Sequence, residues 1–178
     1  MKLKLLLLFI IIPILFSCEV NTTSQADITS TDLVGTWNLT NFKIDNAILN
    51  ILSPDPATIT ASGFGKNYNA SITFTENPNQ VSVDGNFDFE LTYTNGQTYI
   101  ENIYLDATLL NNTFGSSSSS WRIDNNILSL IESREIINIE IIEYTGSKIV
   151  VETKINQTIT INNFTAEIAG KAFITLER

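Results

Sequence analysis

Reactive side chains are scarce in this 178-residue sequence. It contains no histidine and a single cysteine, Cys18, against 19 aspartates and glutamates. Without histidine, and with one thiol, the chain cannot assemble a Ser-His-Asp triad, a Cys-His pair or a zinc site of histidines and cysteines. Paired carboxylates, as used in glycoside hydrolysis, are the catalytic chemistry that remains available.

The positions of the carboxylates favour a solvated surface over a catalytic pair. They alternate with apolar residues or flank turns, as at Asp88, Glu90, Glu140, Glu143 and Glu152. Strict alternation places such side chains on the wet face of a strand. We therefore expect no catalytic residues, and a protein that is not an enzyme.

Two oxygen-rich segments have the ligand chemistry of calcium sites. They are residues 84–86 (Asp-Gly-Asn) and residues 124–126 (Asp-Asn-Asn). Neither has the spaced ligands of a twelve-residue calcium loop, and the same residue types are preferred in tight turns. We interpret both as turns, and the sequence predicts no metal and no cofactor.

The chemistry of Cys18 depends on the residues before it. Lys2 and Lys4 precede an apolar run over residues 5–16, and Ser17 separates that run from Cys18. This layout has the charged, apolar and small-residue parts of an export signal. The run is shorter than the roughly 20 residues that cross the hydrocarbon core as a helix, so it predicts a cleaved segment.

Leu15, Phe16, Ser17 and Cys18 resemble the lipobox of a bacterial lipoprotein signal. The resemblance implies cleavage between Ser17 and Cys18 and attachment of acyl chains, palmitate among them, to Cys18. The protein would then be anchored in the bacterial cell envelope, in the outer membrane, on a face that the sequence leaves open. An ordinary signal peptide cut near Ser17, with an incidental cysteine, is the alternative.

Three segments follow from this interpretation: a signal peptide over residues 1–17, a lipidated flexible tether over residues 18–31, and one domain over residues 32–178. The tether is rich in Asn, Thr, Ser and Gln, and a flexible coil of this length reaches about 20 Å. Removal of residues 1–17 leaves 8 basic and 19 acidic side chains, a net charge of 8 − 19 = −11. That charge argues against nucleic-acid binding and against adhesion to anionic headgroups, so membrane contact is expected through the acyl chains.

Alternation of apolar and polar residues predicts an all-β domain. It is clearest over residues 87–94, and turn residues at 124–126, 145–147 and 162–163 predict hairpins. About eight to ten strands with short connections indicate an antiparallel barrel or sandwich. Residues 46–67, with two prolines and two glycines, are expected to form one long loop.

Gly35 and Trp37, just after the tether, resemble the Gly-x-Trp signature at the start of lipocalin-like barrels. Trp121 with Leu128 resembles a hairpin of small lipocalin-like lipoproteins of the Bacteroidetes group. The resemblance implies an antiparallel up-and-down barrel in which Trp37 closes the end opposite the mouth and Arg178 lies across it. The long loop would then cover the mouth.

A barrel of about eight strands either holds one small ligand or is filled by its own side chains. The candidate lining residues are Phe74, Phe87, Phe89, Tyr93 and Trp121. The same aromatics could interdigitate and leave no cavity. We expect an envelope lipoprotein whose barrel binds or shelters a small hydrophobic ligand; the alternative is a non-enzymatic structural or interaction module that presents loops to a glycan or to an envelope protein. An enclosed cavity favours the first, and an exposed apolar patch outside a filled barrel favours the second.

Overall fold

The residues that the structure describes form nine antiparallel strands in one sheet, which confirms the all-β prediction. The computed structural model describes residues 27–53, 55–94, 98–106, 113–114, 119–132, 135–161 and 164–178. A short helix and nine strands lie within them: α1 (Ser30–Leu33), β1 (Gly35–Ser53), β2 (Ala57–Thr75), β3 (Gln80–Thr94), β4 (Thr98–Asp106), β5 (Ser120–Asp124), β6 (Ile127–Glu132), β7 (Glu135–Tyr144), β8 (Lys148–Ile161) and β9 (Phe164–Glu177).

The sheet closes into a barrel. Its strand order is β2-β1-β9-β8-β7-β6-β5-β3-β4, and a further pairing of β2 with β3 joins the two ends. The closure between β3 and β5 is short: Gln80 pairs with Ser120, and the Val81 N–H donates to the Ser119 carbonyl at 3.2 Å. Beyond that point β3 pairs with β4 instead, from Asn86 to Thr94.

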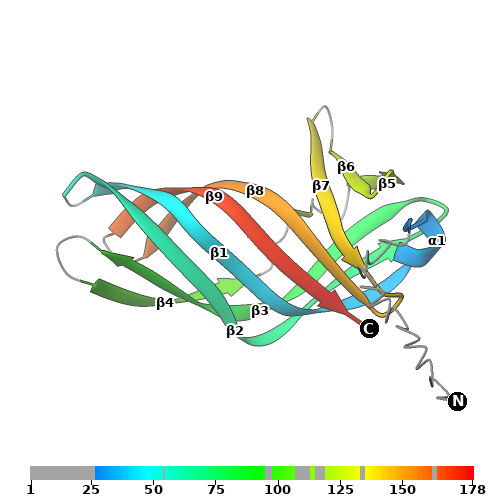
Figure 1. The fold of residues 1–178 in the computed structure, drawn as a ribbon, viewed down its shortest axis with the longest axis horizontal. Helices are drawn as coiled ribbons and strands as arrows, with labels where there is room; N and C mark the ends of the chain where they lie inside the picture. The colour runs from blue at the N-terminus through cyan, green and yellow to red at the C-terminus, as the bar shows by residue number, and fades with distance from the viewer. Residues whose placement is uncertain are drawn as a thin grey trace, which may run out of the picture.

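The two ends of the barrel are therefore built differently (Figure 1). Near α1 the wall includes β5, β6 and β7, and at the opposite end β4 replaces them. β8 pairs with β7 only as far as Glu152 and continues beside β9 to Ile161. Among the described residues, β4 and residues 153–161 of β8 face each other with no strand pairing between them; we call this gap in the wall the seam.

Residues 46–67 do not form a loop, so the predicted mouth-covering segment is wrong. They continue β1 and β2 as long paired strands, apart from a short connection around Asp55 and Pro56. Gly63 and Gly65, two of the residues that indicated a loop, lie within β2, and Asn46 in β1 and Asn67 in β2 both have a φ of 50°. Bulges and positive-φ residues let long strands bend around a barrel.

The hairpin predictions have mixed outcomes. Asn125 and Asn126 have positive φ and join β5 to β6, and Gly146 with a φ of 82° joins β7 to β8, as predicted. Residues 84–86, interpreted as a turn, instead lie inside β3. The predicted turn at residues 162–163 lies outside the described residues.

The packed domain begins before residue 32, within the segment assigned to the tether. Ile28 belongs to the hydrophobic core, and α1 starts at Ser30. The Ile28 N–H donates to the Asn126 side chain at 3.3 Å, so the chain is fixed to the β5–β6 turn before β1 begins. Residues 28–31, which were predicted from the sequence to be part of the tether, therefore belong to the packed domain.

Candidate functional site

Trp37 closes the barrel at the end beside α1. Its side chain is fully buried, and its indole N–H donates to the Leu33 carbonyl at 2.8 Å. That carbonyl is the last of α1, so the short helix supplies the acceptor that a buried indole needs. Gly35 precedes the tryptophan with a φ of 124°, a conformation that L side chains rarely adopt.

Arg178 lies across Trp37, as the sequence resemblance implied. Its guanidinium carbon is 4.3 Å from the centroid of the tryptophan ring, a cation–π contact. The same guanidinium donates to the Gly146 carbonyl at 2.9 and 3.1 Å and to the Val34 carbonyl at 3.3 Å. One arginine therefore ties the β7–β8 turn and the start of β1 to the closed end.

Substitution of Arg178 by alanine is expected to lower the free energy of unfolding by about 1 kcal/mol, because an exposed cation–π contact and its hydrogen bonds are each worth that order. Urea denaturation followed by circular dichroism measures the change. Arg122→Ala, which removes another exposed arginine from β5, is the matched control and should change stability by less than about 0.5 kcal/mol. Equal stability of Arg178→Ala and the native protein would mean that this contact is incidental.

Asp32 and Tyr144 border the same closed end. Hydrogen bonds from the Thr29 side chain and backbone lower the pKa of Asp32, and Arg178 acts in the same direction. Burial raises the pKa of Tyr144, and the neighbouring Asp32 carboxylate raises it further. Both shifts favour an ionised Asp32 and a protonated Tyr144 near neutral pH.

Several aromatic side chains pack against one another in the interior, among aliphatic residues. Phe42 contacts Phe87 and Phe89 with ring centroids 5.3 and 5.7 Å apart, and Phe74 meets Trp121 edge to face at 5.7 Å. Such tilted and edge-to-face pairs are the arrangements that aromatic rings prefer in a packed core.

A small void remains beneath the seam. Its volume is about 20 Å³, enough for about one water molecule but well below the roughly 300 Å³ of a typical ligand pocket. The side chains around it come from five strands, and all but one are apolar: Phe42, Ile44, Phe89, Ile103, Leu105, Ile155, Gln157 and Ile168. Gly63 on β2 makes room for Phe89 here, because a Cβ at Gly63 would lie 2.3 Å from the Phe89 ring.

Comparison with known families agrees with this geometry. Residues 33–151 match the family model of the lipocalin-like domain. The chain belongs to the lipocalin-like domain family. No curated protein and no solved structure matches the chain.

The lipocalin-like barrel buries all five residues predicted to line it: Phe74, Phe87, Phe89, Tyr93 and Trp121. Of these, Phe89 borders the void and the other four belong to the filled interior. The sequence prediction missed the residues around the void on β1, β4, β8 and β9. The alternation of apolar and polar residues in these strands was visible in the sequence. The way these residues come together around one void depends on where the pairing of β7 with β8 ends, which no local signal specifies.

Several predicted features of the lipocalin-like protein cannot be placed in the structure. Ser17, Cys18 and the rest of residues 1–26 lie outside the described residues. In the described ranges, no group of three or more Cys, Asp or Glu side chains is arranged to hold a metal ion. No helix within those ranges is long and apolar enough to cross a membrane.

Proposed function

We propose that this protein is a lipid-anchored lipoprotein of the bacterial cell envelope whose lipocalin-like barrel binds a small hydrophobic molecule. The observation that carries the ligand proposal is the apolar surface beneath the seam, where seven of eight surrounding side chains are apolar. Binding sites for small molecules are mostly apolar with few polar groups, and Gln157 supplies the single polar side chain here. The protein has no catalytic role in this proposal.

The size of the void sets a condition on binding. A hydrophobic ligand of several carbons does not fit into about 20 Å³, so it must displace side chains or separate β4 from β8. The seam makes this separation inexpensive, because no backbone hydrogen bonds of a strand pair cross it among the described residues. The closed end, held by Trp37 and Arg178, stays fixed while the opposite end opens.

The anchor rests on the sequence alone. The apolar run before Ser17 and the single cysteine after it support export and acylation of Cys18. Two or more acyl chains hold a protein stably on a membrane, so the acidic barrel needs no membrane-binding surface of its own.

The filled-barrel alternative is favoured by the same small void. Were the seam to stay closed, the interior would be a core, and the protein would act as a structural or interaction module. Exposed apolar side chains such as Phe64, Ile100 and Tyr104 would then provide contacts for a partner.

Substitutions on β4 distinguish the ligand-binding barrel from the filled-barrel interaction module. A dansyl-labelled fatty acid titrated into the purified protein should gain fluorescence on binding. Ile103→Gln places an amide beside the void and should weaken binding at least about tenfold. Tyr104→Gln, one residue along but 66% exposed on the outer face, is the control and should leave affinity within about twofold. Failure of the native protein to bind any apolar probe would instead support the interaction module.

A further inference from the structure

The pairing between β1 and β2 is interrupted near the middle of the barrel wall. The strands pair from Gly35 to Asn38 on β1, and pairing resumes only at Lys43. Between these points β1 contributes residues 39–42 and β2 contributes residues 65–70, so the two strands are of unequal length and must separate. Pairing continues on both sides of the interruption, so the opening is local.

A bulge on the other side of β2 shapes this opening. Asn67 and Tyr68 together face Phe87 of β3, and Asn67 has a φ of 50°. β3 approaches closely at Gly85, where a Cβ would lie 1.9 Å from the Asn69 carbonyl oxygen. Gly85 has a φ of 95°, a backbone conformation that favours glycine. Both this conformation and the close approach to Asn69 therefore require glycine at this position.

The bulge directs Tyr68 toward β1. Its hydroxyl oxygen accepts a hydrogen bond from the Phe42 N–H at 2.8 Å, and its ring stacks on Phe87 with centroids 5.7 Å apart. Burial raises the pKa of Tyr68, so the hydroxyl keeps a proton to donate. Tyr68 thus bridges the interrupted strands and forms one wall of the opening.

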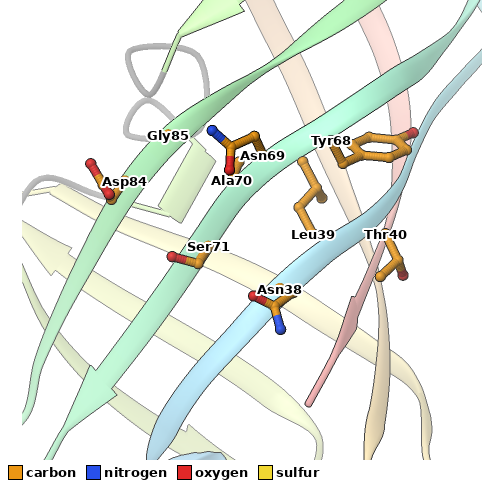
Figure 2. Close-up of a pocket in the computed structure, with 9 residues that line it drawn as sticks. All are labelled: Asn38, Leu39, Thr40, Tyr68, Asn69, Ala70, Ser71, Asp84 and Gly85. Atoms are coloured by element: carbon orange, nitrogen blue, oxygen red, sulfur yellow. The ribbon is translucent and has the colours of Figure 1, made fainter.

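The result is an outward-facing groove of about 510 Å³ across β1, β2 and β3 (Figure 2). Leu39 and Ala70, both nearly fully buried, form an apolar floor. The polar groups around it are two amides, one carboxylate, two aliphatic hydroxyls and one phenol. They belong to Asn38, Asn69, Asp84, Thr40, Ser71 and Tyr68, respectively. This volume falls within the roughly 300–1,000 Å³ of small-molecule sites.

Most of these polar groups are available to a ligand. Four side chains of the groove form no hydrogen bond with any other described residue: Asn38, Asn69, Ser71 and Asp84. Amides offer both donors and acceptors, hydroxyls offer both, and a carboxylate accepts up to four hydrogen bonds. The groove therefore presents a dense, mixed set of donors and acceptors above an apolar floor.

The charge of the groove narrows the ligand class. It contains no lysine or arginine, so it lacks the cation that recognises phosphate, sulfate or a carboxylate. It contains one carboxylate, Asp84, whereas a metal ion held by protein oxygens needs several such ligands. The remaining donors and acceptors match a neutral molecule with many neighbouring hydroxyls.

We propose that this groove binds a neutral carbohydrate. The amides, the hydroxyls and Asp84 would bond the sugar hydroxyls at the exposed polar rim of the groove. The site lies outside the barrel, so it is independent of the hydrophobic molecule proposed for the interior. The protein would then hold a glycan on its surface while anchored in the envelope.

Saturation-transfer NMR and isothermal titration test this proposal with the full chain in detergent and four neutral probes: maltotriose, cellotriose, mannotriose and triacetylchitotriose. At least one probe is expected to bind, and a saturating dansyl-labelled fatty acid should not compete with it. The double variant Asn38→Ala/Asn69→Ala should weaken binding at least about tenfold. Both side chains are exposed, so the fold should be retained.

Asn156→Ala is the matched control, because it removes an exposed amide from β8 outside the groove. Its affinity for the sugar should equal that of the native protein. The proposal is overturned by the absence of binding for all four probes, by equal affinity of the double variant, or by preference for the anionic trigalacturonate.

Discussion

Replacing Trp37 with alanine is expected to lower the free energy of unfolding by about 3–5 kcal/mol. The side chain is fully buried at the closed end of the barrel, so its removal leaves a cavity and exposes the core. It also leaves the Leu33 carbonyl without its indole partner and Arg178 without the ring beneath it. A loss of this size is a large share of the roughly 5–15 kcal/mol that stabilises a typical domain.

Urea denaturation followed by far-ultraviolet circular dichroism measures this loss. Trp37→Phe keeps an aromatic ring but not the N–H donor, and should lose about 1–3 kcal/mol. Tyr104→Ala, at a side chain 66% exposed on β4, is the control and should lose less than about 0.5 kcal/mol. A loss below about 1 kcal/mol for Trp37→Ala would contradict the role given to the closed end.

Replacing Cys18 with serine is expected to abolish acylation and release the protein from the membrane. Cys18 is the only thiol in the chain, and the anchor proposal assigns all membrane attachment to its acyl chains. Residues 18–178 contain 8 basic and 19 acidic side chains, so an anionic membrane surface would repel this part of the chain and not retain it. Acyl labelling should therefore be lost completely, and the protein should leave the membrane once residues 1–17 are also removed.

Labelling with an alkyne analogue of palmitate and fractionation of the membranes measure both effects in a bacterium that processes lipoproteins. The matched control is the double variant Cys18→Ser/Ser24→Cys, which restores a thiol six residues along the chain. It should remain unlabelled, because the thiol no longer follows the apolar run and Ser17. Continued membrane association of a Cys18→Ser protein that has lost residues 1–17 would show that another part of the protein provides the anchor.

The fold was predictable because its signals are local. Alternation of apolar and polar residues identified strands, and Asn-rich or Gly-containing turns identified the β5–β6 and β7–β8 hairpins. Trp37 and Arg178 were identified as a pair by family resemblance, and the structure brings them together.

The same local signals were misleading over residues 46–67. Gly63, Gly65 and Asn67 are typical of loops, yet in this barrel glycine gives room to Phe89 and Tyr68, and Asn67 forms a bulge. A residue that bends a strand and a residue that ends one have the same conformational preferences, so composition cannot separate them.

A different reason explains why the void and the groove could not be predicted from the sequence. Each depends on how distant segments pair: the void on β8 leaving β7 at Glu152, and the groove on the unequal lengths of β1 and β2 between Asn38 and Lys43. Gly85 carried the one local signal for the groove, but it was interpreted as part of a turn. Long-range register decides both sites.

Native mass spectrometry of the acylated protein, extracted from bacterial membranes and compared with its denatured mass, tests the central claim most directly. Denaturation keeps the covalent acyl chains and removes a bound molecule, so the difference between the two masses reports the ligand alone. A reproducible non-covalent increment from an apolar molecule, reduced in Ile103→Gln and retained in Tyr104→Gln, is the predicted result. Identical native and denatured masses, before and after incubation with fatty acids and isoprenoids, would contradict ligand binding by the barrel.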